Sequence, residues 1–173
     1  MMKIPLAKGK FAIVDDCDFN WLNQWNWQLT TGRCDYAYRY LQVDKERYTI
    51  LMHRMIIGIC GIEGVFVDHI NRDSLDNRMG NLRLCSRSEN TANSKKRKGC
   101  TSKYKGVSKR KDCDRWVAGI KNGNKKVYLG LYYKEEDAAK VYDKAAKECF
   151  GEFALLNFPE KLISDEILFE SKQ

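Results

Sequence analysis

One polar stretch, residues 67–93 (VDHINRDSLDNRMGNLRLCSRSENTAN), constrains the fold more than any other part of this sequence. Between His69 and Leu84 its only apolar residues are Ile70, Leu75, Met79 and Leu82. So few apolar side chains cannot form a core, and the order of its Asn, Asp and Ser residues is not typical of a solvated linker. The rest of the chain is therefore expected to hold this stretch and to aim its polar side chains.

The adjacent Asp and His of this stretch supply groups that phosphodiester hydrolysis requires. The reaction needs an activated water and a cation that offsets charge on the phosphate oxygens. His69 is the expected general base, because imidazole titrates near neutral pH. Asp68 points to the opposite face of an extended strand, where it can hold a hard metal ion. Asn81 is expected to return across a hairpin loop and to fix the orientation of the His69 ring.

The segments after His69 are predicted to position a second metal ligand. Residues 71–77 are rich in side chains that hydrogen-bond their own backbone, which favours a tight, self-supporting loop. Ser86 and Glu89 form the S-x-x-E pattern of a capping box, so a helix is expected to begin there. Asn90 would project from this helix. Together, Asp68 and Asn90 would clamp one Mg²⁺ or Mn²⁺ ion and leave its other positions to water and phosphate.

The motif D-H-I-N-x-D-x-x-D-N-x-x-x-N-L-R followed by E-N-x-x-N resembles the HNH nucleases, in the variant of phage and intron homing endonucleases whose last motif position is Asn. The resemblance covers about residues 52–93 and implies a ββα-metal fold. The implied roles are metal ligation by Asp68 and Asn90, general base catalysis by His69, and orientation of that base by Asn81. Asn77 and Asn93 also match the pattern and are expected to make structural contacts in the loop and the helix.

The region before the motif is predicted to be a small β-rich fold. Its expected elements are a strand at 10–14, a helix capped by the carboxylates of residues 15–18, a hairpin of 35–43 with 47–51, and a short buried helix at 52–60. The aromatic residues between positions 19 and 27 are expected to fill the core. His53 is either a core residue with its polar atoms satisfied or an accessory group beside the metal or phosphate, and Arg54 is a second accessory candidate.

Positive charge is concentrated after the motif. The formal net charge of the chain is +8, and residues 95–126 contain thirteen Lys and Arg against two Asp. Aromatic and β-branched residues are interleaved with these charges, which favours a structured surface for a polyanion over a solvated linker.

A second small module is predicted at residues 103–159, after a polar, basic linker at 95–102. Its three strand candidates are residues 104–108, 115–121 and 126–131, and an Asn-Gly-Asn turn signal joins the last two. Residues 134–150 should be a helix, because their apolar side chains form one stripe and acidic residues occupy the first turn. The helix would cover one face of the sheet and leave the other, basic face open.

The motifs Y-K-G-V, W-V-A-x-I, V-Y-L-G, A-A-x-x-Y-D-x-A-A and L-N-F-P occur in this order and closely resemble the Apetala/ethylene-response-factor DNA-binding domain. The resemblance implies that the sheet docks on double-stranded DNA through Lys105, Gly106, Ser108, Arg110, Trp116, Lys121, Lys126 and Tyr128. The linker residues expected to follow the phosphates are Lys95, Lys96, Arg97 and Lys98. Trp116 is equally compatible with packing inside the sheet. Ser108, Gly119 and Tyr128 depart from the plant pattern, so the plant target sequence is not expected to transfer.

Composition excludes several other classes of protein. Seven cysteines occur without any C-x-x-C spacing, so neither a disulfide framework nor a structural zinc is expected, and the thiols should be reduced and mostly structural. No segment approaches the roughly twenty apolar residues of a membrane span, and the N-terminus lacks the apolar run of a signal peptide. The expected location is therefore the cytoplasm, of a bacterium or a phage-infected host, with no membrane partner and no small-molecule substrate.

The sequence thus predicts an α+β protein in which a small β-rich region leads into a ββα-metal HNH module, followed by a three-stranded antiparallel sheet packed on one helix. The predicted divisions are residues 1–94 with an HNH core at about 52–94, a linker at 95–102, the DNA-binding module at 103–159, and an acidic tail or short helix at 160–173. The predicted activity is metal-dependent cleavage of DNA by a monomer or weak dimer, with a nick as first product. The alternatives are a non-catalytic, sequence-specific DNA-binding regulator on an HNH scaffold and an RNA-binding protein.

Overall fold

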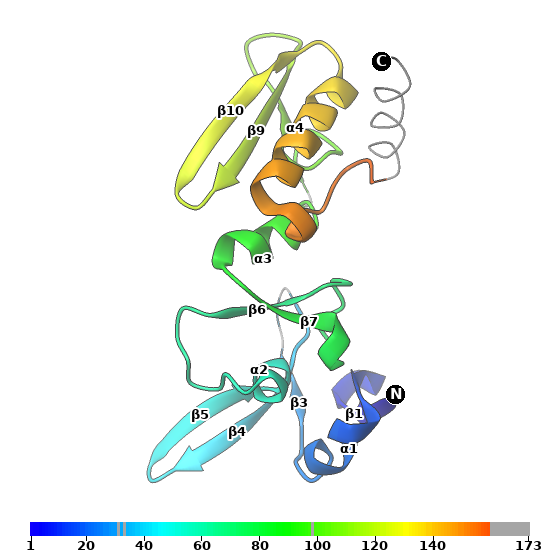
Figure 1. Ribbon diagram of the computed structural model, residues 1–173, viewed down its shortest axis with the longest axis vertical. Helices are drawn as coiled ribbons and strands as arrows, with labels where there is room; N and C mark the ends of the chain where they lie inside the picture. The colour runs from blue at the N-terminus through cyan, green and yellow to red at the C-terminus, as the bar shows by residue number, and fades with distance from the viewer. Residues whose placement is uncertain (31, 33, 98, 160–173) are drawn as a thin grey trace, which may run out of the picture. The chain divides into compact units, whose positions relative to one another are not determined.

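A computed structural model describes residues 1–30, 32, 34–97 and 99–159 (Figure 1). The chain forms two compact units, residues 1–90 and 91–173, and the boundary between them falls inside helix α3. Both units combine short helices with small antiparallel sheets, which confirms the predicted α+β class.

The first unit contains three small sheets. Its elements are β1 (Met2–Pro5), the 3-10 helix η1 (Ala7–Gly9), β2 (Phe11–Val14), α1 (Asp16–Leu22), β3 (Gln28–Leu29), β4 (Ala37–Val43), β5 (Glu46–Leu51), α2 (Met52–Ile57), β6 (Phe66–His69), the 3-10 helix η2 (Met79–Asn81), β7 (Leu82–Cys85) and the start of α3 (Arg87–Asn93). Strands β1 and β2 pair, β3, β4 and β5 form a meander, and β6 pairs with β7. The predicted strand, helix and hairpin positions are confirmed. The sequence did not predict β1, which buries one apolar residue, Ile4.

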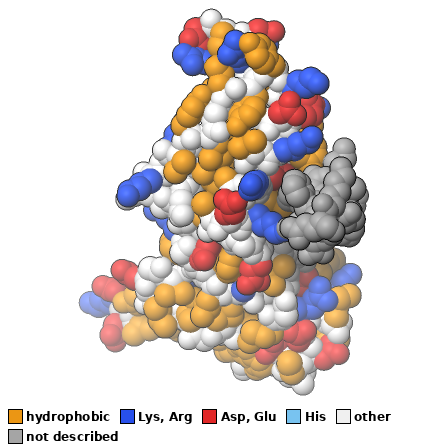
Figure 2. Space-filling model, turned by 45° about the horizontal axis from the view of Figure 1, so that its top comes forward, with side chains coloured by type: hydrophobic (Ala, Val, Ile, Leu, Met, Phe, Trp, Pro, Cys, Tyr) orange, Lys and Arg blue, Asp and Glu red, His pale blue; other side chains and the backbone are white. Residues whose placement is uncertain are grey.

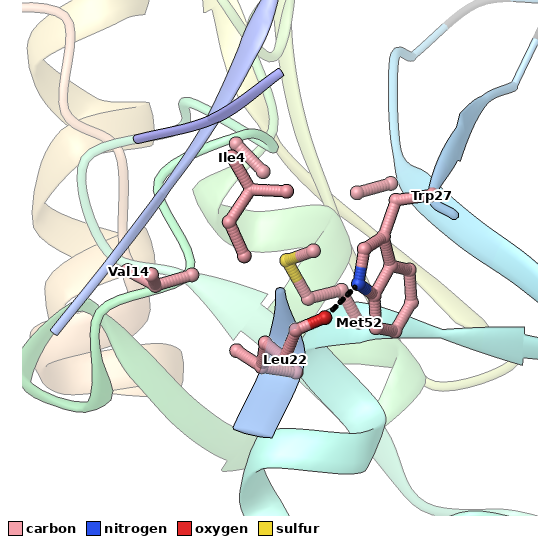
Figure 3. Packing of buried hydrophobic residues seen from close by; sticks show 7 residues of the cluster. Ile4, Val14, Leu22, Trp27 and Met52 are labelled. Atoms are coloured by element: carbon pink, nitrogen blue, oxygen red, sulfur yellow. Dashed lines mark hydrogen bonds between the residues drawn. The ribbon is translucent and has the colours of Figure 1, made fainter. Parts of the chain in front are cut away.

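Ile4, Val14, Leu22, Trp27 and Met52 form the centre of the first core (Figure 3). Trp27 is 3% exposed, and its indole Nε1 donates a 2.8 Å hydrogen bond to the backbone oxygen of Leu22. This bond satisfies the polar atom of a buried indole. The predicted aromatic core is thereby confirmed, and it carries α2 through Met52, which is fully buried.

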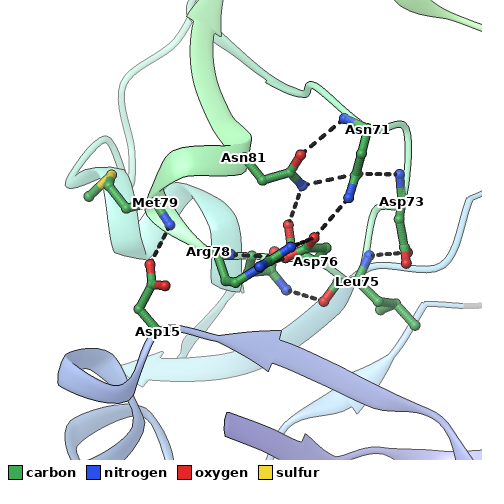
Figure 4. A network of polar contacts seen from close by, with 9 residues as sticks. Asp15, Asn71, Asp73, Leu75, Asp76, Arg78, Met79 and Asn81 are labelled. Carbon is green, nitrogen blue, oxygen red and sulfur yellow. Dashed lines mark hydrogen bonds and ion pairs between the residues drawn. The ribbon is translucent and has the colours of Figure 1, made fainter. Parts of the chain in front are cut away.

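Strand β2 also supports the polar loop between β6 and β7. Ile13 donates a backbone hydrogen bond to Leu75 at 2.8 Å and accepts one from Asn77 at 2.7 Å. The carboxylate of Asp15 accepts a 2.7 Å hydrogen bond from the backbone N–H of Met79 (Figure 4). Strand β2 therefore supplies backbone hydrogen-bond partners to the loop, which does not depend on its own contacts alone.

The second unit is a sheet covered on one face by a long helix. Its elements are the end of α3, β8 (Val107–Lys109), β9 (Trp116–Asn122), β10 (Lys125–Tyr132), α4 (Glu135–Phe150) and the 3-10 helix η3 (Gly151–Phe153). The strand order is β10-β9-β8, all antiparallel. Ala138, Ala139 and Ala146 of α4 are at most 2% exposed against this sheet, and such small side chains let a helix lie close. The predicted three strands and helix are confirmed.

Gly106 marks the closest approach of helix and sheet. Its φ is +75°, and a Cβ at this position would lie 1.8 Å from the ring of Tyr142 in α4. Only glycine combines this backbone conformation with the absence of a side chain.

Ser102, which the sequence places in the linker, is a buried residue of the second unit. Its hydroxyl donates a 2.6 Å hydrogen bond to the carboxylate of Glu135 at the start of α4. The predicted linker therefore ends earlier, because this bond ties Ser102 to the helix. Lys98 and the predicted tail, residues 160–173, lie outside the described residues.

All seven cysteines are unpaired, and five of them are exposed: Cys17, Cys34, Cys60, Cys100 and Cys149. The prediction of mostly structural thiols is therefore wrong for these five, because they do not pack in a core. No helix in the described ranges has the length and apolar character needed to cross a membrane. On the face of the molecule drawn in Figure 2, exposed hydrophobic side chains occur among both acidic and basic ones.

Candidate active site

Strands β6 and β7 and helix α3 form the strand-strand-helix arrangement predicted for the polar stretch. Asp68 pairs with Arg83 across the two strands, and His69 pairs with Leu82. The capping box that starts α3 is formed in both directions. The backbone N–H of Ser86 donates to Glu89 Oε2 at 2.7 Å, and the N–H of Glu89 donates to Ser86 Oγ at 3.2 Å. Hydrogen bonding of the Glu89 carboxylate by Ser86, first by its backbone N–H, lowers the pKa of Glu89.

His69 is the buried imidazole at the end of β6. The residue is 6% exposed, and burial lowers the pKa of its imidazole. The hydrogen bond to Asn77 and the nearby carboxylate of Asp68 act in the opposite direction. Nε2 of His69 lies 3.4 Å from Oδ1 of Asn77. The amide of Asn77 is oriented by a 3.1 Å hydrogen bond from its Nδ2 to the backbone oxygen of Leu75. Because an amide oxygen can only accept, this contact assigns the His69 proton to Nε2 and leaves Nδ1 as the basic nitrogen.

The amide of Asn81 hydrogen-bonds the loop and not the His69 ring that it was predicted to orient. Its Oδ1 accepts a 3.0 Å hydrogen bond from the backbone of Asn71. Its Nδ2 donates to Oδ1 of Asn71 at 3.0 Å and to the backbone oxygen of Asp76 at 2.7 Å (Figure 4). Both N–H groups of the amide are thus used within the loop. Asn81 therefore links the two ends of the loop. Asn77, which was expected to make a structural contact, is the residue whose amide faces the His69 ring.

The same network fixes the loop from within. Asp76 is 2% exposed, and it accepts hydrogen bonds from Arg78 Nη2 at 2.7 Å and from Asn71 Nδ2 at 2.8 Å. The bond from Arg78 is the main reason why the pKa of Asp76 is lowered. The loop is therefore also held by its own hydrogen bonds, as its Asn and Asp content predicts. Arg78 balances the charge of the buried Asp76 carboxylate.

Asp68 is held by an arginine that the sequence analysis left without a role. Nε and Nη2 of Arg83 lie 2.9 and 2.8 Å from Oδ2 of Asp68. Asp68 is 4% exposed, so its ionised form needs such a partner. Asn90 is half-buried on α3, and Asn93 is buried one turn later, 5% exposed. Among the described residues, no three His, Cys, Asp or Glu side chains gather into a metal-binding group.

His53 and Arg54, the two accessory candidates, have different surroundings. His53 is 6% exposed, and its ring centroid lies 5.1 Å from that of His69. The ring of Tyr36 lies 5.2 Å from His53 and 6.1 Å from His69. Arg54 instead donates hydrogen bonds to the backbone oxygens of Ile59 at 3.0 Å and Val65 at 2.7 Å. Its guanidinium therefore holds the segment before β6, and an accessory role of Arg54 beside the metal or phosphate stays a prediction.

In the second unit, four of the predicted DNA contacts lie together on the open face of the sheet. Ser108 pairs with Val117, Lys126 with Lys121, and Tyr128 with Gly119. Residues opposite each other in an antiparallel pair share a face, and the alternate positions Ala118 and Ile120 are buried under α4. The exposed members of this open face are Ser108, Lys121, Lys126 and Tyr128.

Three other predicted contacts point elsewhere. Trp116 packs with the core under α4, because it lies on the same side of β9 as Ala118. Gly106 lies against Tyr142. The ammonium of Lys105 donates to the backbone oxygens of Thr91 at 3.2 Å and of Ser94 at 2.7 Å, and also to that of Ala92. These carbonyls lie at and just after the C-terminal end of α3, where backbone oxygens lack intrahelical donors, so Lys105 caps that helix.

The remaining predicted contacts lie outside the sheet face. Arg110 is exposed and donates to Asp112 at 2.6 Å. Of the predicted linker residues, Lys95 and Arg97 are exposed and Lys96 is half-buried. Lys98 belongs to the part of the chain that is not described.

Sequence reasoning missed Arg83 and Tyr36 as neighbours of the site. Arg83 stands in the N-L-R end of the motif, and its cross-strand pairing with Asp68 follows once the register of β6 and β7 is known. Tyr36 comes from β-rich sequence more than thirty residues before the motif. No local pattern links Tyr36 to the site, so only the packing of the hairpin region on the polar loop brings it there.

The comparisons with known proteins agree with this geometry. The HNH endonuclease family matches residues 52–92. An uncharacterised HNH endonuclease of Acanthamoeba polyphaga mimivirus is 31% identical over 155 residues, which cover 87% of this chain and 76% of the viral protein.

Two further relatives are Arabidopsis thaliana proteins that match over shorter segments. An ethylene-responsive transcription factor is 48% identical over 59 residues, 33% of this chain and 14% of that protein. A dehydration-responsive element-binding protein is 34% identical over 91 residues, 46% of this chain and 44% of that protein. The chain thus spans less than half of each plant protein, and these matches support a fusion of an HNH module with a plant-type DNA-binding domain. From its similarity to the viral protein along most of both sequences, the chain belongs to the HNH endonuclease family.

Proposed function

We propose that this protein is a metal-dependent DNA endonuclease that nicks one strand at a site recognised by its second unit. The observation that carries the proposal is the environment of His69. The imidazole is buried next to Asp68 in sequence, its Nε2 faces Asn77 Oδ1 at 3.4 Å, and burial lowers its pKa. A lowered pKa keeps the ring neutral near pH 7, which is the form that accepts a proton from water.

In the proposed reaction, Nδ1 of His69 takes a proton from a water molecule. The resulting hydroxide attacks phosphorus, and the bond from phosphorus to the 3′ oxygen breaks. Asn77 holds the ring in the tautomer whose basic nitrogen is Nδ1, and Asn81 acts indirectly by closing the loop that carries Asn77. Arg83 holds the carboxylate of Asp68 in place on β6.

The donor set fits one hard divalent cation such as Mg²⁺ or Mn²⁺. Asp68 offers a carboxylate from β6 and Asn90 an amide oxygen from α3, and Mg²⁺ commonly takes one or two carboxylates and fills its other positions with water and substrate phosphate. When bound, such an ion would supply positive charge beside the phosphate oxygens and the leaving oxygen.

The proposed DNA-docking surface is the open face of the second unit's sheet. Lys121 and Lys126 are exposed beside Tyr128, which is 62% exposed. A narrow sheet of this kind can enter the major groove of duplex DNA. A single active site acting once cuts a single strand, so a monomer or weak dimer would give a nick first.

The proposal is tested with supercoiled plasmids that carry a random or phage-genomic library, followed by mapping of the cut ends on both strands. The wild-type protein with Mg²⁺ or Mn²⁺ should convert target plasmids to open circles. His69→Ala should lower the rate by about 10²–10⁴-fold, the usual contribution of a general base. Chelation of the divalent metal should stop the reaction.

The control for this assay is binding of the same target by wild type and His69→Ala, measured in the presence of a chelator. Equal binding by the two proteins assigns the loss to chemistry. If wild type binds its target but never nicks it, or if His69→Ala cuts equally well, the protein is a DNA-binding regulator on an HNH scaffold. A preference for RNA over duplex DNA across a salt titration would contradict the proposed substrate.

A further inference from the structure

His53 is a second buried histidine beside the proposed base, and neither the fold nor the proposed reaction uses its polar atoms. It lies in the first turn of α2. Its ring meets that of His69 edge to face, with a centroid distance of 5.1 Å and an interplanar angle of 78°. Tyr36 packs on the same ring at 5.2 Å. These two contacts fix where the His53 ring lies relative to His69.

The two ring nitrogens of His53 have different environments. Nδ1 is fully buried and has no hydrogen-bond partner among the described residues. A buried N–H without an acceptor costs about 1–3 kcal/mol, so the proton belongs on Nε2. Of the two ring nitrogens, only Nδ1 is a fully buried atom without a partner, and no hydrogen bond joins Nε2 to a described residue. Nε2 is therefore the nitrogen that a ligand can reach, and it carries a hydrogen to donate.

The charge state of His53 is also fixed by its surroundings. Burial, together with the nearby His69 and the guanidinium of Arg54, lowers the pKa of His53 to about 3. The lowered pKa keeps the ring neutral near pH 7. A neutral imidazole in such a place acts as a hydrogen-bond donor that does not have to lose a proton.

We propose that His53 is a second catalytic histidine, whose Nε2–H donates a hydrogen bond to a non-bridging oxygen of the scissile phosphate. The inference rests on the proposed function and extends it. A water activated by His69 and the phosphate that it attacks must occupy the space within about 3 Å of the basic nitrogen. The centroid of the His53 ring lies 5.1 Å from that of His69, close enough for a phosphate beside His69 to reach His53 as well. Negative charge grows on the non-bridging oxygens in the transition state, where a preorganised donor is most effective.

The test uses three substitutions of His53 in the full-length protein. In His53→Gln the amide nitrogen lies near the position of Nε2, and in His53→Asn it lies near that of Nδ1. His53→Phe keeps a ring against His69 and Tyr36 but has no donor. Each variant is assayed on an oligonucleotide duplex containing a mapped cut site, under single-turnover conditions with saturating enzyme, beside wild type and His69→Ala.

The expected rates distinguish the effect of losing the hydrogen-bond donor from the effect of losing the packed ring. His53→Phe and His53→Asn should slow cleavage about 10²–10³-fold, as the loss of one oxyanion donor does. His53→Gln should retain a rate at least about 10-fold above that of His53→Phe, because it restores a donor near Nε2. The affinity for the duplex in chelator should stay within about threefold of wild type for all three variants.

A phosphorothioate at the cut site gives a readout that a purely structural role would not change. Sulfur accepts a hydrogen bond more weakly than oxygen, so one of the two stereoisomers should slow the wild-type protein. The same sulfur should have a smaller effect on His53→Phe, which has no donor to lose. If His53→Phe folds poorly by circular dichroism, the comparison of His53→Gln with His53→Asn gives the answer, because both lack the ring.

The inference is overturned if His53→Phe cleaves within about twofold of the wild-type rate, or if sulfur has equal effects on wild type and on a donor-lacking variant. It is also overturned if His53→Gln and His53→Phe lose equal amounts of activity. If His53→Phe does not fold, equal losses in His53→Gln and His53→Asn have the same meaning. The proposed function is judged separately in the same assay. If wild type cuts and His69→Ala does not, the nuclease assignment stands whatever the His53 variants do. If wild type leaves the duplex intact, the proposed function fails and the inference fails with it.

Discussion

His69 and Asn77 form the contact on which the proposed chemistry depends most directly. Asn77 is 1% exposed and uses its amide nitrogen on Leu75, so its oxygen is held facing the imidazole. At 3.4 Å the contact is long for a hydrogen bond, so it is better described as an orienting contact than as a strong bond. In the proposed reaction, this contact determines which nitrogen of His69 carries the proton.

Removal of this amide should slow the proposed cleavage without abolishing it. Asn77→Ala takes away the acceptor for Nε2, so the His69 proton is no longer confined to that nitrogen, and we expect a loss of about 10–100-fold, as for other groups that orient a reacting residue. Met79→Ala is the matched control, because this loop side chain is 50% exposed and only its backbone bonds Asp15. Equal rates for the two variants would contradict the orienting role.

The buried rings should also make folding sensitive to acid. The pKa of His53 is about 3 in the folded protein against 6.5 for the free side chain, so the unfolded chain binds the proton first as pH falls. Stability is therefore present above about pH 6.5 and lost below it, by about 2 kcal/mol between pH 7 and pH 5. Urea unfolding at both pH values should show this extra loss in wild type relative to His53→Phe. Identical losses would contradict it, because His69 is present in both proteins.

Among the elements, α3 depends on contacts at both of its ends. Ser86 and Glu89 satisfy backbone groups at its start, and the ammonium of Lys105 donates hydrogen bonds to carbonyl oxygens at its end. A helix of seven residues is too short to be stable alone. Its two capped ends therefore explain how such a short helix can present Asn90 in a defined place.

Loss of the capping box should destabilise the protein measurably. Ser86→Ala removes the acceptor for the N–H of Glu89, at a cost of about 1 kcal/mol. Ser88→Ala is the control, because alanine is favoured inside a helix and Ser88 is not the cap. Because Ser86 lowers the pKa of Glu89, the effect of Ser86→Ala should shrink as pH falls through the pKa of that carboxyl. A urea midpoint that shifts equally for both variants would contradict the capping role.

For the molecule as a whole, the two units are proposed to divide chemistry and docking between them. The lysines of the second unit do not all serve the same purpose. Lys121 and Lys126 are exposed on the open sheet face, whereas the ammonium of Lys105 is engaged by backbone carbonyls. Counting basic residues in the sequence does not distinguish a phosphate contact from a helix cap.

Salt dependence of DNA binding should separate these two kinds of lysine. Lys126→Ala should lower the slope of log affinity against log salt by about 0.9, the value for one lost phosphate contact. Lys105→Met should leave the slope unchanged and lower the thermal stability, because three backbone oxygens lose one charged hydrogen-bond donor. A reduced slope for Lys105→Met, or an unchanged slope for Lys126→Ala, would contradict the proposed docking face.

Most of the helices and strands, and the kinds of side chain that could carry the chemistry, were predictable from local sequence. Alternating apolar residues, the Asn-Gly-Asn turn and the S-x-x-E box are local signals, so β9, β10 and the start of α3 were predictable. Strand β1 was not, because its single buried residue is meaningful only once it pairs with β2.

Only the tertiary structure decided which polar groups meet. Asn71, Asn77 and Asn81 carry the same amide within eleven residues, and spacing alone does not say which one faces His69; the hydrogen bonds of the folded loop assign that place to Asn77. Arg83 beside Asp68 and Tyr36 beside His53 likewise depend on strand register and packing. The physical reason is that backbone conformation is governed mainly by neighbours in the chain, whereas the partner of a buried polar group is chosen by whatever the whole fold brings within hydrogen-bond distance.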